Sequence, residues 1–150
     1  MPYMTDTGFT AAFINYLYSG ATNTMTALTT PLHLRLMTAL GAGNGNVHSS
    51  NGTEATSGNC PGYSAGGATM GATAFSTFNS TSPAAITNNN SVTWTATGTW
   101  TTIVGVEIWN TNGSPSRQAQ GATTSNITGV SNGDTVQFAA ASVSLDPTSW

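Results

Sequence analysis

The chain has 150 residues, and a chain of this length buries roughly 70% of its unfolded surface around one core, which favours a single domain over residues 1–150. Only 5% of the residues are charged, against about 25% in an average soluble protein, and the net charge is −3. Two arginines and no lysine form no basic patch, which argues against nucleic acids and anionic membranes as partners. A surface with so little charge has little electrostatic defence against association.

The apolar runs are far shorter than the ~20 residues of a membrane-spanning helix. The N-terminal M-P-Y-M-T-D lacks the basic and apolar regions of a signal peptide, so we expect a soluble protein that does not follow classical secretion. Cys60 is the only cysteine, which excludes an intrachain disulfide. We interpret it as a small side chain in a loop rather than as a catalytic thiol.

The first predicted element is a helix over about residues 7–18. A capping residue at Thr5, Asp6 or Thr7 can start it, and Ser19-Gly20 can end it. Apolar side chains recur within it at spacings of three and four, at Phe9, Phe13, Tyr16 and Leu17. Because the polar face carries no Lys or Arg, the pattern predicts a helix that packs on one end of a sheet rather than on a membrane.

A strand is predicted where the sequence reads P-L-H-L-R-L-M. Strict alternation places Leu32, Leu34 and Leu36 on one face, toward a core, and His33 and Arg35 on the other face.

A loop is predicted over about residues 41–62, where the sequence offers almost nothing to bury and two Asn-Gly pairs indicate turns. Loops of this length are uncommon in compact domains unless they are functional. We therefore interpret this loop, together with the two ends of the chain, as the contact surface. The interface candidates are Tyr3, Met4, Val47, His48, Glu54, Cys60, Tyr63 and Trp150. For the two ends, packing back onto their own sheet remains an open alternative.

The stretch from Ser91 to Asn110 holds three of the four tryptophans and the longest β-branched run. It predicts two strands joined at the Ala96-Thr97-Gly98 turn. The second strand is apolar on both faces, which is typical of a central strand. The predicted core residues are Leu34, Val104, Val106 and Phe138.

Beyond this hairpin, the turn at Thr111-Asn112-Gly113-Ser114 predicts that Ser116 to Gln120 returns antiparallel to Ile103 to Trp109. Val136 and Phe138 share one phase of alternation, whereas Val143 and Leu145 share the other. This change across Ala139-Ala140-Ala141 predicts a bulge or a strand that changes sheets. Together these elements predict a mainly β fold, an antiparallel β-sandwich that is jelly-roll-like and carries one short N-terminal helix.

The ionisable residues provide little material for catalysis. His33 and His48 have no metal-ligand spacing, so we expect neither a metal nor a cofactor, and no G-x-S-x-G motif is present. A glycosidase would need two carboxylates at a set separation. Asp134 lies in a predicted turn, and Glu107 is expected to form a salt bridge with Arg35 or Arg117. Glu54 is expected to be solvated or at an interface, so the balance is against an enzyme.

Several motifs follow one another in a characteristic order along the chain. They are the helix, the L-x-L-x-L strand after Pro31, the G-T-E of Gly52, Thr53 and Glu54 with Gly62-Tyr63, the run from Trp100 through Ile103, Val104 and Ile108 to Trp109, an Asn-Gly turn, and N-G-D-T before F-A-A-A (Asn132 to Ala141). This order resembles the small β-rich virion proteins of tailed bacteriophages, which include head decoration, minor capsid and minor tail proteins. The resemblance covers most of the chain from about Phe9 onward.

The resemblance implies a structural protein of the virion, above all a head decoration or cement protein on the outer capsid surface. Its expected partners are the major capsid protein and further copies of itself in a symmetric oligomer, with a homotrimer expected at local three-fold positions. Its expected location is the phage head, after synthesis in the host cytoplasm. The alternative is a minor tail or fibre module that binds a host surface glycan.

Overall fold

The computed structural model describes residues 31–41, 52–71, 74, 86–110 and 117–145, and these residues form antiparallel β-structure without a helix. The helix expected over residues 7–18 lies outside the described residues. The strands are β1 (Leu32–Ala39), β2 (Thr53–Glu54), β3 (Ala68–Thr69), β4 (Ile86–Thr87), β5 (Val92–Thr95), β6 (Ile103–Asn110), β7 (Arg117–Ile127), β8 (Thr135–Phe138) and β9 (Ser144–Leu145).

Within the described ranges, the largest sheet has five strands in the order β2-β1-β6-β7, with β3 also paired to β1. Two further ladders pair β4 with β9 and β5 with β8. The predicted return of the chain after β6 is confirmed, because β7 pairs antiparallel with β6. β7 continues to Ile127, well past the predicted end at Gln120.

The two faces of β1 are as predicted. Leu34 lies opposite Ile108 and Leu36 lies opposite Val106, and partners in an antiparallel pair point to the same side. Leu32, Leu34 and Leu36 are buried, with exposed fractions of 3%, 0% and 0%. Arg35 lies opposite Glu107 on the other face.

The predicted hairpin between Ser91 and Asn110 is wrong, because β5 pairs with β8, whereas β6 pairs with β1 and β7. The residues between β5 and β6 carry the chain from one ladder to the other. Trp100 fills this passage, 5% exposed, and its indole Nε1 donates to the carbonyl of Pro61 at 2.8 Å. Alternation tells which face of a strand is buried but not which strand lies beside it.

The core assignment needs one correction. Leu34 and Val106 are buried, and half-buried Phe138 packs against the core. Val104 is only half-buried, whereas Ile103 is fully buried in the core. Val104 lies at the end of β6 where its regular pairing with β7 is interrupted.

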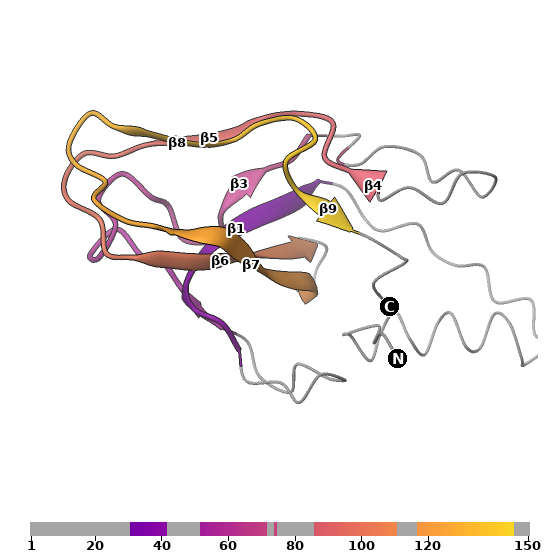
Figure 1. The fold of residues 1–150 in the computed structure, drawn as a ribbon, viewed down its shortest axis with the longest axis horizontal. Helices are drawn as coiled ribbons and strands as arrows, with labels where there is room; N and C mark the ends of the chain where they lie inside the picture. Colours follow the sequence, from indigo (N-terminus) through magenta and orange to yellow (C-terminus); the bar gives the residue numbers. More distant parts are fainter. Residues whose placement is uncertain (1–30, 42–51, 72–73, 75–85, 111–116, 146–150) are drawn as a thin grey trace, which may run out of the picture.

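The β5–β8 ladder lies across from the five-stranded sheet, as Figure 1 shows at the top of the view. The core cluster draws on both, with Trp94 and Val136 from the ladder and Leu34 and Ile108 from the sheet. The rings of Trp94 and Phe138 meet edge to face at 6.2 Å between centroids, a favourable aromatic geometry.

The second half of the predicted 41–62 loop is part of the core. Residues 42–51 lie outside the described part, but β2 pairs with the edge of β1, and Ala55 and Cys60 are both 0% exposed. The backbone of Ala55 donates to the carbonyl of Leu36 at 2.8 Å. Small side chains let this segment approach β1 closely, so its low hydrophobic content did not mean an absence of burial.

Of the two alternatives predicted across Ala139-Ala140-Ala141, a bulge or a change of sheet, the structure shows the change of sheet. β8 pairs with β5, β9 pairs with β4, and Ala141 between them has a positive φ of 63°. Asn88, 2% exposed, holds this crossover: its Nδ2 donates to Ala139 at 2.9 Å, and its Oδ1 accepts from the backbone of Val143 at 2.8 Å.

Candidate functional site

A polar network covers the face of the large sheet that carries His33 and Arg35. Arg35 Nη1 lies 3.1 Å from Glu54 Oε2, and its guanidinium lies 4.0 Å from the centroid of the Trp109 ring. The Trp109 indole donates to Glu107 Oε2 at 2.8 Å, and Glu107 Oε1 pairs with Arg117 Nη1 at 3.3 Å. Stacking of an arginine on tryptophan is the most favourable form of cation–π contact.

The strand register assembles this network. Arg35 on β1 is opposite Glu107 on β6, and Trp109 on β6 is opposite Arg117 on β7. β2 adds Glu54 at the outer edge of β1. The predicted ion pair of Glu107 is therefore confirmed with Arg117.

Glu54 is held by neighbouring groups rather than solvated, which corrects that part of the prediction. Its Oε1 accepts from the Tyr63 hydroxyl at 2.7 Å and from the backbone of Gly66 at 2.6 Å. The same hydroxyl accepts from the backbone of Leu36 at 3.2 Å, so Tyr63 caps the edge of β1. Burial raises the pKa of Tyr63, and the hydrogen bond to Glu54 adds to this effect.

The network ties neighbouring strands of the sheet together. Both arginines and both glutamates are bound to one another or to neighbouring backbone and tryptophan groups. Asp134 accepts from the backbone of Ser131 at 2.7 Å, in the turn where it was expected. Among the described residues, no group of His, Cys, Asp and Glu could hold a metal ion.

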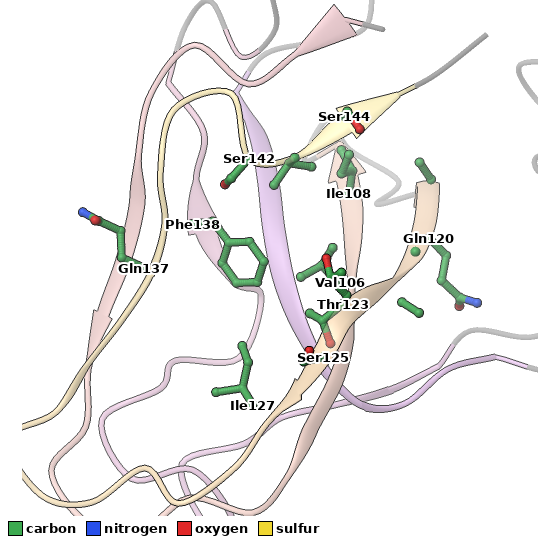
Figure 2. A pocket seen from close by; sticks show the side chains of 15 residues that line it. Val106, Ile108, Gln120, Thr123, Ser125, Ile127, Gln137, Phe138, Ser142 and Ser144 are labelled. Atoms are coloured by element: carbon green, nitrogen blue, oxygen red, sulfur yellow. The ribbon is translucent and has the colours of Figure 1, made fainter. Parts of the chain in front are cut away.

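An open groove lies between β6 and β7 on one side and the β8–β9 segment on the other (Figure 2). Its volume is about 510 Å³, within the range of typical ligand and contact sites. Apolar side chains and neutral hydroxyl-bearing ones line it, among them Val106, Ile108, Thr123, Thr124, Ser125, Ile127, Phe138, Ser142, Val143 and Ser144.

A wide irregularity in β7 shapes this groove. Between two successive pairs, β6 advances two residues, from Gly105 to Ile103, while β7 advances five, from Ala122 to Ile127. The extra residues of β7 therefore bulge away from β6. Figure 2 shows the Phe138 ring directed into the space beside this bulge, with Ile127 below it.

Among the described residues that line the groove, no side chain is ionisable. Gln120 and Gln137 point away from the hollow in Figure 2. The Thr123 hydroxyl is buried and has no hydrogen-bond partner among the described residues. The described lining can therefore provide shape and apolar contact.

None of the predicted interface residues that the structure describes lines the groove. Tyr3, Met4, Val47, His48 and Trp150 are outside the described part of the chain. Cys60 and Tyr63 are buried, with exposed fractions of 0% and 1%, and burial raises the pKa of the Cys60 thiol. Half-buried Glu54 belongs to the polar network.

Sequence reasoning missed the groove, because its walls come from strands far apart in the chain. The one local signal was the run Gly121 to Asn126, which carries no large apolar side chain and therefore breaks the alternation expected of a paired strand.

No protein-family model and no curated protein sequence matches this chain. In the ranges that the structure describes, no helix is long and apolar enough to cross a membrane.

Proposed function

We propose that this protein is a structural protein of a tailed-bacteriophage virion that decorates the outer surface of the head. It binds the major capsid protein as a symmetric oligomer, a homotrimer, and it has no catalytic role. It binds neither nucleic acid nor membrane.

The proposal rests on a difference in charge between the two faces of the large sheet. Both arginines and two glutamates are used in the polar network, whereas none of the described side chains that line the groove on the other face is ionisable. Attachment by such a protein rests on shape, apolar contact and backbone hydrogen bonds. These are the means by which a protein with 5% charged residues can bind a large shell.

The same proposal includes the finer architecture. The five-stranded sheet and the β5–β8 ladder are the two layers of a β-sandwich with jelly-roll-like connections. The shared core of Leu34, Ile108, Trp94 and Val136 supports this assignment. The N-terminal helix over residues 7–18 stays a prediction.

The second candidate is a minor tail or fibre module that binds a host surface glycan. The hydroxyl-bearing Thr124 and Ser125 line the same groove as Phe138 and favour it, since sugars present both hydroxyl groups and apolar ring faces. The two candidates differ in copy number: a decoration protein is present in many copies on the head, whereas a tail protein is present in few copies at one end.

The experiment is quantitative mass spectrometry of purified virions, with the major capsid protein as the internal standard. Decoration predicts copies in simple proportion to the capsid protein, on separated heads and not on separated tails. A few copies that stay with the tails would favour the second candidate, and absence from virions would refute both.

Salt provides a separate measurement of the mode of attachment. At 1 M salt the Debye length falls to about 3 Å, so electrostatic attachment would weaken, whereas apolar attachment would persist. We expect the protein to remain on the heads under these conditions. Release by salt alone would show that charged residues hold it.

A further inference from the structure

We propose that Asn132 is a modification site which the folded turn keeps closed, so that its side-chain amide converts to aspartate and isoaspartate only after the turn opens. Asn-Gly pairs occur four times in the chain, and Asn132-Gly133 is the pair of which the structure describes both residues. This chemistry belongs to the chain itself and does not depend on the proposed function.

The conversion needs no reagent other than water. The backbone nitrogen of Gly133 loses its proton and attacks the side-chain carbonyl carbon of Asn132, a carbon–nitrogen bond forms, and the side-chain nitrogen leaves as ammonia. Water then opens the resulting succinimide ring at either carbonyl, which yields aspartate or isoaspartate. Glycine favours the ring closure, because no Cβ crowds the attacking nitrogen. Both residues are exposed, so water has access to them.

The attacking nitrogen is engaged in the folded protein. The N–H of Gly133 donates to the carbonyl of Ala96 at 2.8 Å, and the backbone of Ala96 donates in return to the carbonyl of Asp134 at 2.9 Å. Ala96 is 1% exposed and directly follows β5, so these two bonds continue the β5–β8 ladder into the turn. The nitrogen can reach the Asn132 side chain only after its bond to Ala96 is broken.

A second pair of hydrogen bonds closes the turn itself. The backbone of Asp134 donates to the carbonyl of Ser131 at 3.0 Å, and the Asp134 carboxylate accepts from the backbone of Ser131 at 2.7 Å. Gly133, the third residue of the turn, has a φ of 90°, as the third residue of a type II turn does. The peptide between Asn132 and Gly133 is therefore held in one orientation, and it must rotate before the ring can close.

Exposure and hydrogen bonding lead to opposite expectations for Asn132. If access of water decided the rate, this exposed pair would convert as fast as it does in an unfolded chain. Because the turn must open first, the rate is instead the intrinsic rate multiplied by the population of the open turn. An opening disfavoured by only about 1.4 kcal/mol already slows the conversion about tenfold.

The conversion would also prevent the turn from closing again as before. Isoaspartate lengthens the backbone between residues 132 and 133, so the N–H of Gly133 no longer meets the carbonyl of Ala96 in register. Either product adds a carboxylate two residues before Asp134, and like charges at short distance repel each other. A converted Asn132 therefore records that the turn of that molecule has opened.

The experiment incubates the full chain in mildly alkaline buffer, folded and unfolded in urea, and follows the conversion of Asn132 with time. Chymotryptic peptides are analysed by tandem mass spectrometry, because a chain with two Lys and Arg residues in total gives trypsin few cleavage sites. Electron-transfer fragmentation distinguishes isoaspartate from aspartate. Hydrogen exchange of the Gly133 amide measures the opening of the turn independently.

Two variants test the turn as the protecting element. Asp134→Ala removes the acceptor of the Ser131 N–H, whereas the matched control Asp134→Asn retains a side-chain oxygen at that place. Circular dichroism and thermal unfolding show whether each variant folds.

We expect Asn132 to convert at least about tenfold more slowly in the folded wild type than in urea, and the Gly133 amide to exchange slowly. Folded Asp134→Ala should convert faster than the folded wild type, and Asp134→Asn should stay close to it. Conversion of the folded wild type at the rate found in urea would overturn the inference. So would a folded Asp134→Ala that converts no faster than the wild type. If Asp134→Ala does not fold, fast exchange of the Gly133 amide in the wild type would still overturn it.

Discussion

Glu107 Oε1 lies 3.3 Å from Nη1 of Arg117 on the neighbouring strand, and the two side chains are only 1% and 6% exposed. The glutamate also accepts hydrogen bonds from the Trp109 indole and from the backbone of Gly52. One carboxylate therefore links β6, β7 and the segment that leads into β2. A buried pair of this kind is costly to form but far more costly to break from one side.

Replacing Glu107 by Ala should lower the free energy of unfolding by about 3–5 kcal/mol, because Arg117 would lose this counter-charge inside the protein. The control is Glu54→Ala. It should lower the free energy of unfolding by less, because Glu54 and its partner Arg35 are both partly exposed. Urea unfolding followed by tryptophan fluorescence measures both. Equal losses in the two variants would contradict the view that burial makes the Glu107 pair the more important one.

The corrected core can be tested at two adjacent residues. Ile103→Ala should cost about 2–5 kcal/mol, since Ile103 is 0% exposed. Val104→Ala should cost clearly less, because Val104 is only half-buried and loses fewer carbon atoms. The midpoints of urea unfolding compare the two variants directly. If Val104→Ala lowered the free energy of unfolding more than Ile103→Ala, the core assignment of Val104 predicted from sequence would be correct after all.

The Cys60 thiol should be unreactive in the folded protein. It is 0% exposed, and burial raises its pKa, so both access and the thiolate form that reacts are suppressed. Titration with a thiol reagent should detect no group under native conditions and one group in denaturant. Rapid reaction of the native protein would place Cys60 at the surface.

Tyr63 should make stability depend on pH in alkaline solution. The pKa of Tyr63 in the folded protein is raised above the unfolded value of about 10. Its contribution to the free energy of unfolding is therefore complete below about pH 10 and is lost as the pH rises above that value. Between the unfolded pKa and the raised folded pKa of Tyr63, this group lowers the free energy of unfolding by about 1.4 kcal/mol per pH unit. Unfolding in urea at about pH 8 and about pH 11 measures it.

Tyr63→Phe is the control for this effect. It should be less stable than the wild type at about pH 8, because the hydrogen bonds to Glu54 and Leu36 are lost, but its stability should fall less on going to about pH 11. Equal alkaline losses in the two proteins would mean that Tyr63 is not the group responsible.

Local sequence patterns were sufficient for the features that depend on neighbouring residues. The period of two identified the core face of Leu34 and the outer face of Arg35, and the turn residues identified the role of Asp134. The change of phase across Ala139 to Ala141 correctly indicated that the chain leaves one ladder for another. Each of these depends on backbone geometry within a few residues.

Only the tertiary structure decided which strands are neighbours and what fills the space between them. β5 alternates as a hairpin partner of β6 would, yet it pairs with β8, because the choice depends on which faces must cover the core. The bulge of β7 and the partners of Glu54 likewise depend on residues far away in the chain. The groove therefore could not be read from the sequence, since its walls meet only after the sheet and the β8–β9 segment have packed together.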